Sequence, residues 1–334
     1  MHLLLSRTDA IGDVCLTLPA IGWLKSQRPD WKISILVKAY AAPVAQACHW
    51  LDAVFVLPDD LNVQQTAAWL EDLNIDHLIH VFPNRMLAKA GKQAGIQKRS
   101  GVFGRPFHWL TCNKMVWLSR ANSRQHEALL NIQLLAKLLG LPAPSFADLQ
   151  QHLLAWGGLP AWPAHHQAQS KQVILHLYSR GSGREWPIAH FATLAHRLVA
   201  LGYQPVVTGT TADAQSFSQD ATLFPNETLN VMGQDSLADL LKRISQAAGL
   251  VASGTGPLHM ASLTGCPRVG LFPPRQNIDG LRWGAIGPAS ANLELNKRCE
   301  LKCSNKSCAC MAAITPEQVE HQLLRMIDSS QNAI

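Results

Sequence analysis

One stretch of the chain combines the residue types that bind a phosphate group. Residues 249–252 predict the end of a buried strand, and the Gly254-Thr255-Gly256 turn after them lets the backbone approach a ligand closely. Pro257 suits the first turn of a helix, whose N–H groups and positive dipole end would then face a bound anion. His259 would add a hydrogen-bond donor or a positive charge. The alternative is an ordinary strand-to-helix turn with a hydrogen-bonded histidine.

A second stretch offers a carboxylate at an equivalent position. The short apolar strand Leu3–Leu5 is followed by a loop and by Ile11-Gly12-Asp13, after which apolar residues recur at helical spacing. A carboxylate at such a turn serves either as a general base or as a first-turn partner of the helix dipole. Pro19 predicts a kink in this helix or a late start.

These residues must be positioned by alternating strands and helices. Strands are predicted over 32–37, 53–57 and 77–82, with segments of helical length between them. After a Gly- and Pro-rich stretch at 155–170, the same alternation restarts with strands over 172–177, 205–208 and 268–272 and helices over 187–201 and 236–247. Alternation of this kind indicates two α/β units with parallel sheets, and therefore a ligand at the carboxyl ends of their strands.

Composition narrows the function classes. The 334 residues carry a net charge of +6 with 47% hydrophobic residues, which favours a globular protein with an acidic partner. No DNA- or RNA-binding signature is present, so a nucleic-acid partner is not expected. No run of 18 apolar residues occurs and the N-terminus lacks a secretory pattern, so we expect a cytoplasmic location.

A basic segment in the N-terminal half is interspersed with aromatic residues. Its rings, at Phe103, Phe107, Trp109 and Trp117, suit contact with an anionic lipid headgroup or a phosphorylated sugar, whereas a solvated helix face is the alternative on charge alone. The candidate acceptor-binding cations are Arg85, Lys89, Arg99, Arg105 and Arg120.

The eight cysteines do not form a disulfide scaffold. Four of them stand alone among apolar residues and are interpreted as buried thiols, at Cys15, Cys48, Cys112 and Cys266. The other four cluster late in the chain without the paired C-x2-C spacing of structural zinc sites, which leaves reduced thiols, a local bridge or zinc open for Cys299, Cys303, Cys308 and Cys310.

Taken together, these motifs resemble the heptosyltransferases of lipopolysaccharide core assembly, glycosyltransferase family 9. The N-terminal mark is 11–14 (Ile-Gly-Asp-Val) with 17–20 (Thr-Leu-Pro-Ala), and His126-Glu127 also fits. The C-terminal marks are 184–187 (Arg-Glu-Trp-Pro), 208–213 (Thr-Gly-Thr-Thr-Ala-Asp), 255–259 and 270–273 (Gly-Leu-Phe-Pro). The resemblance covers nearly the whole chain.

The resemblance implies the GT-B fold, in which two Rossmann-like domains with parallel sheets face a central cleft. It implies an N-terminal acceptor-binding domain over 1–156 and a C-terminal nucleotide-sugar-binding domain over 171–314. A closing helix over 315–334 is expected, and whether it returns to the N-terminal domain is left open.

The same resemblance implies an inverting transfer of L-glycero-D-manno-heptose from an ADP donor to the inner core of lipopolysaccharide. The reaction would take place at the cytoplasmic face of the inner membrane, with the enzyme bound peripherally and with neither a cofactor nor a metal. Asp13 matches the family's proposed general base. The matching donor-binding positions are Ser179, Arg180, Arg184, Asp213, Gly254, Thr255, Gly256 and His259.

This sequence departs from the family pattern at two of these positions. Arg184 stands where the family usually has a lysine, and arginine keeps the charge but not the geometry. Gly254 stands where the family usually has an aspartate, which removes a carboxylate from the surroundings of the donor sugar. A GT-B glycosyltransferase with another donor, a nucleotide-sugar epimerase and a non-catalytic paralogue that binds nucleotide or lipid core are the alternatives.

Overall fold

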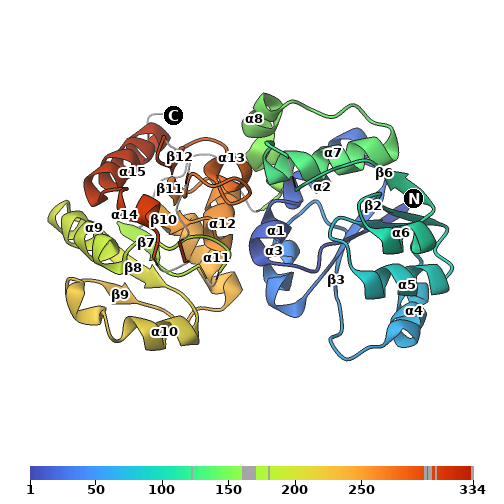
Figure 1. Cartoon of the computed structure of the whole chain (residues 1–334), viewed down its shortest axis with the longest axis horizontal. Helices are drawn as coiled ribbons and strands as arrows, with labels where there is room; N and C mark the ends of the chain where they lie inside the picture. The colour runs from blue at the N-terminus through green and yellow to red at the C-terminus, as the bar shows by residue number, and fades with distance from the viewer. Residues whose placement is uncertain are drawn as a thin grey trace. The chain divides into compact units, whose positions relative to one another are not determined.

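The computed structural model describes residues 1–121, 123–159, 171–179, 181–296, 299, 303–304 and 307–331. By internal contacts the chain divides into two units, one of Met1–Leu149 with Ala155–Pro160 and the other of Gln150–Leu154 with Ala161–Ile334. Each unit is built on its own six-stranded sheet (Figure 1). Every strand pairing in both sheets is parallel.

The N-terminal sheet has the strand order β3-β2-β1-β4-β5-β6. Its central strands are short runs of buried apolar residues, as expected for strands covered on both faces. The strands are β1 (His2–Ser6), β2 (Lys32–Val37), β3 (Ala53–Val56), β4 (His77–His80), β5 (Lys98–Val102) and β6 (Lys114–Val116).

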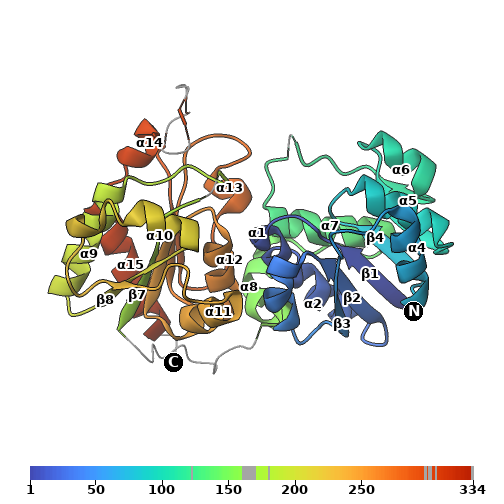
Figure 2. The same cartoon turned by 90° about the horizontal axis from the view of Figure 1, so that it is seen from below.

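Helices cover this sheet in two groups. In one group α4 packs against α5 and α5 packs against α6. In the other α2 packs against α7 (Figure 2). The helices of the N-terminal half are α1 (Ile11–Cys15), α2 (Leu18–Gln27), α3 (Ala42–Gln46), α4 (Val63–Asp72), α5 (Arg85–Gln93), α6 (Pro106–Thr111), α7 (Glu127–Leu139) and α8 (Phe146–Gly157).

Proline divides the first helical segment, as predicted. The first helix ends at Cys15, and α2 begins at Leu18 with Pro19 in its first turn, where the missing N–H costs nothing. The short helix α1 is therefore set apart as the positioning element for Asp13.

The C-terminal sheet has the order β12-β11-β10-β7-β8-β9, which repeats the topology of the first sheet. Its strands are β7 (Gln172–His176), β8 (Gln204–Thr208), β9 (Leu229–Asn230), β10 (Gly249–Ser253), β11 (Arg268–Leu271) and β12 (Ser290–Leu293). Its helices are α9 (Ile188–Ala200), α10 (Thr211–Phe217), α11 (Leu237–Gln246), α12 (Gly256–Thr264), α13 (Gly280–Trp283), α14 (Ala309–Ala312) and α15 (Pro316–Gln331).

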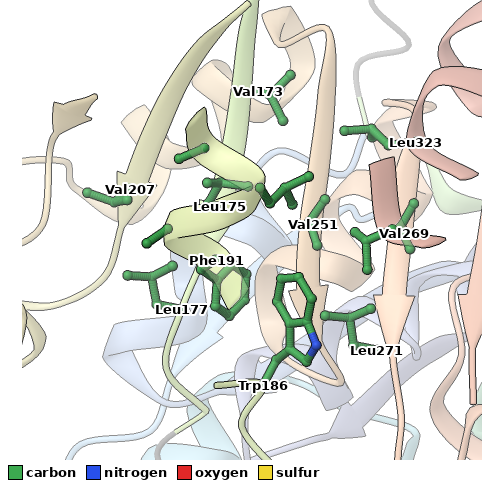
Figure 3. Close-up of a cluster of buried hydrophobic side chains, with 14 of the residues drawn as sticks. Val173, Leu175, Leu177, Trp186, Phe191, Val207, Val251, Val269, Leu271 and Leu323 are labelled. Atoms are coloured by element: carbon green, nitrogen blue, oxygen red, sulfur yellow. The ribbon is translucent and has the colours of Figure 1, made fainter. Parts of the chain in front are cut away.

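The core of the C-terminal unit holds the loop after β7 in place. Trp186 and Phe191 lie against strand side chains such as Val251 and Leu271 (Figure 3). The indole Nε1 of Trp186 donates to the backbone oxygen of Ile314 at 2.9 Å, so both the polar and the apolar parts of this side chain are satisfied. This contact fixes the end of the loop that carries the predicted donor-binding residues.

The closing helix α15 packs within the C-terminal unit. It contacts α9 and the strands β10, β11 and β12, and its Leu323 and Ile327 belong to the core of that unit.

The sequence correctly predicted the main alternation but missed four strands, β5, β6, β9 and β12. The strands β5 and β6 lie in the basic segment, where Lys98, Arg99 and Lys114 conceal the apolar pattern. The buried hydroxyl of Ser100 in β5 forms a hydrogen bond of 2.6 Å with the His77 ring, so neither of these two buried polar groups is left without a partner. No described helix is long and apolar enough to cross a membrane.

All eight cysteines are free thiols in the structure. Three of the four isolated cysteines are buried as predicted, but Cys112 is only partly buried because it follows the short helix α6 near the surface. Cys308 and Cys310 are buried in the C-terminal core, and Cys299 and Cys303 pack against it. The described residues contain no group of three side chains arranged to hold a metal ion.

Candidate active site

Both sheets have a switch point, where the strand order reverses between two central strands. It lies between β1 and β4 in the first sheet and between β7 and β10 in the second. Ligands of open α/β sheets bind outside the carboxyl ends of the strands at such a point. Asp13 follows β1, Ser179 follows β7, and Gly254 follows β10, so the structure places these predicted residues at the two switch points.

At the N-terminal switch point, a buried arginine holds the predicted base. The guanidinium of Arg7 is 3% exposed and pairs with Asp13 through Nη2 and with Asp9 through Nε, the latter at 2.9 Å. The backbone oxygen of Asp13 accepts from the Thr17 hydroxyl at 2.8 Å, which ties α1 to the start of α2. The side chain of Asp13 is 19% exposed, so its carboxylate is held and still open to a ligand.

A second ion pair closes this cluster from α7. Glu127, the first residue of α7, is 2% exposed and pairs with Arg120, while its Oε1 lies 3.6 Å from Arg7 Nη2. Arg120 also donates to Asn131 Oδ1 at 2.9 Å. Sequence reasoning took Arg120 as an acceptor-binding cation and missed its partner. The sequence did contain an indication of this pair, because Glu127 is a charged residue at the start of an otherwise apolar helix.

At the C-terminal switch point, α12 begins with buried polar side chains. Thr255 is the N-cap residue, yet its side chain makes no capping hydrogen bond. Among the described residues, neither its Oγ1 nor the Oγ of Ser253 has a hydrogen-bond partner, although both atoms are buried. His259, in the first turn, is 2% exposed. Because a buried hydroxyl without a partner is costly, these groups are suited to a ligand at the helix start.

The loop after β7 lies beside this helix start. Ser179 Oγ donates to the backbone oxygen of Gly183 at 3.0 Å and to Glu185 Oε1 at 3.2 Å, so Ser179 shapes the loop. A Cβ atom at Gly183 would lie 3.8 Å from the backbone of Gly254. Arg180 lies outside the described residues.

Arg184 lies next to the late cysteines. Burial would raise the pKa of the Cys303 thiol, but hydrogen bonds with Cys308 and Arg184 outweigh it and lower that pKa. Arg184 also lines a cavity of about 10 Å³ together with Gly254 and Phe272. The structure therefore brings two predicted donor-binding residues together and adds Phe272, which sequence reasoning did not select.

Phe272 fills the space beside Gly254. A Cβ atom at Gly254 would lie 2.7 Å from Phe272 Cε1, and one at Gly270 would lie 2.6 Å from Cε2 of the same ring. Real Cβ contacts are not this short, so the ring is accommodated because both positions are glycine. No carboxylate lines this cavity among the described residues.

Asp213 has a structural role in addition to its predicted one. It closes a capping box at α10, where its Oδ2 accepts from the N–H and the hydroxyl of Thr210, both at 2.7 Å. This capping role accounts for the position of the Asp213 carboxylate, and its donor-binding role stays a prediction.

The remaining predicted cations are distributed over a surface of the N-terminal unit. Arg85, Lys89 and Arg105 are exposed, the first two one turn apart on α5. Arg99 instead donates to the backbone oxygens of Thr111, at 2.8 Å, and Ile96. Exposed apolar side chains accompany these exposed cations. They are Trp109 at 62%, Leu110 at 76% and Trp117 at 75%, the last stacked on Phe103 with ring centroids 4.8 Å apart.

Comparisons with known proteins identify the family and support the fold. The sequence model of glycosyltransferase family 9 (heptosyltransferase) matches residues 85–313. A putative glycosyltransferase of Haemophilus influenzae is 23% identical over 311 residues, covering 87% of this chain and 88% of its own. The structure of Escherichia coli ADP-heptose lipopolysaccharide heptosyltransferase II matches all of both chains with a TM-score of 0.78 and 17% identity. An E. coli heptosyltransferase solved with ADP matches with a TM-score of 0.74 and 15% identity, covering 98% of this chain and 100% of that one.

Proposed function

This chain belongs to glycosyltransferase family 9, the heptosyltransferases, and from that premise we propose that it transfers heptose from ADP-heptose to the inner core of lipopolysaccharide. The observation that carries the proposal is the start of α12. There, the buried hydroxyls of Ser253 and Thr255, which have no hydrogen-bond partner among the described residues, immediately precede the first turn, which contains His259. The loop of Arg184 lies beside this helix start. Such a group of donors fits a diphosphate.

The reaction is a single displacement with inversion. The acceptor hydroxyl gives its proton to Asp13, and its oxygen attacks the anomeric carbon of the donor. The bond from that carbon to the β-phosphate oxygen breaks, and ADP leaves with the electron pair. In this scheme the helix start, His259 and Arg184 stabilise the charge on the leaving diphosphate, so the step requires no divalent metal.

The exposed surface of α5 and α6 is our candidate for the phosphorylated acceptor and for peripheral attachment to the cytoplasmic face of the inner membrane. Arg85, Lys89 and Arg105 supply positive charge, and Trp109 and Trp117 supply rings of the kind that lie at headgroup level. Reversing the charge of Arg85 and Lys89 should raise the acceptor Michaelis constant while the donor constant stays the same. An unchanged acceptor constant would return this surface to a solvated helix face.

The proposal is tested first by calorimetric titration of the whole chain with ADP, UDP and GDP in the absence of metal. Selective binding of ADP is expected, and preference for UDP or GDP would contradict the proposed donor. Asp13→Asn should then abolish transfer from ADP-heptose to lipopolysaccharide truncated in its inner core, with ADP affinity retained. Loss of both together would refute the base assignment.

A second candidate is the same reaction with a different donor sugar. Gly254 and Phe272 favour it, because they leave an aromatic ring where a carboxylate would face the sugar. Turnover of a panel of nucleotide sugars with acceptor present decides between the two. Donor conversion without acceptor would instead indicate an epimerase, and binding without product would indicate a non-catalytic paralogue.

A further inference from the structure

Arg7 is shared between carboxylates from three elements. Its Nε pairs with Asp9 of the loop after β1 at 2.9 Å, and its Nη2 pairs with Asp13 of α1 and lies 3.6 Å from Glu127 of α7. The guanidinium is 3% exposed, so water does not screen these interactions strongly. The strength of the attraction between Arg7 and Asp13 therefore depends on the other two carboxylates.

A second cation, Arg120, acts on this cluster, and its charge also lowers the pKa of Asp9. Arg120 pairs with Glu127 and donates to Asn131, so it is directed to the α7 side. Asp9 is held in position by Tyr40, whose hydroxyl donates to the Asp9 backbone oxygen. The side chain of Asp9 is 18% exposed and lies against Nε of Arg7, next to the Nη2 that pairs with Asp13.

We propose that Asp9 is a positioning residue for the base. By holding the Nε edge of Arg7, it prevents that guanidinium from neutralising Asp13 fully, and so keeps the Asp13 carboxylate able to accept the proton of the acceptor hydroxyl. This inference rests on the proposed function, because it assigns Asp9 a role in the transfer that Asp13 performs.

The charge state of Asp9 makes this role visible in a pH profile. Burial raises the pKa of Asp9 to about 7, with Arg7 lowering it and Asp13 raising it. As the pH rises through this value, Asp9 loses its proton and competes more strongly for Arg7. Arg7 then neutralises Asp13 less, so kcat should rise in a step near neutral pH.

The experiment measures kcat against pH from 5 to 9 for the whole chain, with ADP-heptose and truncated lipopolysaccharide both saturating. Asp9→Asn should lose the step and lower the plateau by about 3- to 10-fold, a small part of the 10²- to 10⁴-fold that a positioned base supplies. Asp9→Glu should restore a step. The control is Asp52→Asn, which removes an ion pair to Lys25 of 2.7 Å elsewhere in the same unit and should leave the profile unchanged.

The outcomes separate the two proposals. If wild-type chain transfers heptose, Asp13→Asn does not, and Asp9→Asn keeps the wild-type profile, the role of Asp9 is refuted and the proposed function stands. If Asp13→Asn transfers normally, the base assignment itself fails. Circular dichroism at each pH monitors folding. Should Asp9→Asn not fold, Asp9→Glu carries the test, because an unmoved midpoint of its step would overturn the inference.

Discussion

Adding one methyl group at Gly254 should destabilise the C-terminal unit, because Phe272 occupies the space. The new Cβ would lie 2.7 Å from Phe272 Cε1 and 3.5 Å from Cζ. The ring cannot retreat into solvent, because it is only 1% exposed. Forcing an extra methyl group into a packed core costs about 1–3 kcal/mol. In a unit of this size, that corresponds to a fall of roughly 2–12 °C in melting temperature.

The assay is differential scanning calorimetry of Gly254→Ala, with hydrogen exchange at β10 and β11 to assign the shift to the C-terminal unit. The matched control is Gly183→Ala in the adjacent loop, whose added Cβ would meet nothing closer than 3.8 Å. A double-mutant cycle with Phe272→Leu supplies the decisive number. The smaller side chain should relieve at least about 1 kcal/mol of the penalty, as expected for residues in contact.

Two results would refute this reasoning. Gly254→Ala could melt with Gly183→Ala at the wild-type temperature, which would mean that the ring yields without cost. Alternatively, the two changes could be additive, which would mean that the loss at Gly254 has nothing to do with Phe272.

Three further predictions concern the N-terminal unit. Burial and the neighbouring His108 lower the pKa of His80 from 6.5 to about 3, so the unfolded state alone takes up a proton as the pH falls below 6.5. The free energy of unfolding, measured with urea, should then fall by about 2 kcal/mol between pH 7 and 5. The fall should be smaller in His80→Gln. Glu127→Gln should lower the free energy of unfolding by about 3–5 kcal/mol, because it removes a carboxylate from the buried Arg7 and the partly buried Arg120. Asp52→Asn, at a more exposed pair, should lower it by about 0–1 kcal/mol, and equal losses would contradict the prediction. Gly22→Ala should lower the free energy of unfolding by about 3 kcal/mol, because the added Cβ would lie 2.1 Å from a backbone oxygen of α8. Gly104→Ala serves as the control, because its added Cβ would meet no atom within 4 Å.

The α/β alternation could be predicted from the sequence because the central strands are continuous apolar runs. The residues of β2 and β10 are almost entirely buried, and a strand that is buried on both faces has to be apolar along nearly its whole length. The strands β5 and β6 could not be predicted in this way. They carry lysine and arginine, and β6 is the edge strand beside β5, so nothing in their local pattern distinguishes them from a loop.

The positions of the site residues could be predicted, but their partners could not. Asp13, Ser179 and Gly254 each follow a strand, and parallel strands bring their carboxyl ends to one edge. The pairing of Arg7 with Glu127 joins segments far apart in the chain, and it depends on how α7 packs beside α2. Such a contact is set by tertiary packing, which single-residue spacing does not encode.

Gly254 shows why comparing a motif one position at a time gives an incomplete account of this site. From the sequence it is a missing carboxylate, and restoring the aspartate would look like a return to the family pattern. In the structure the same space belongs to Phe272, and Gly270 makes room for the other edge of that ring. The three residues form one packing solution, so an aspartate introduced alone would meet the ring before it could reach a sugar. We therefore predict that activity toward ADP-heptose depends on these three residues together, and that Gly254→Asp with Phe272 in place reports the steric clash rather than sugar recognition.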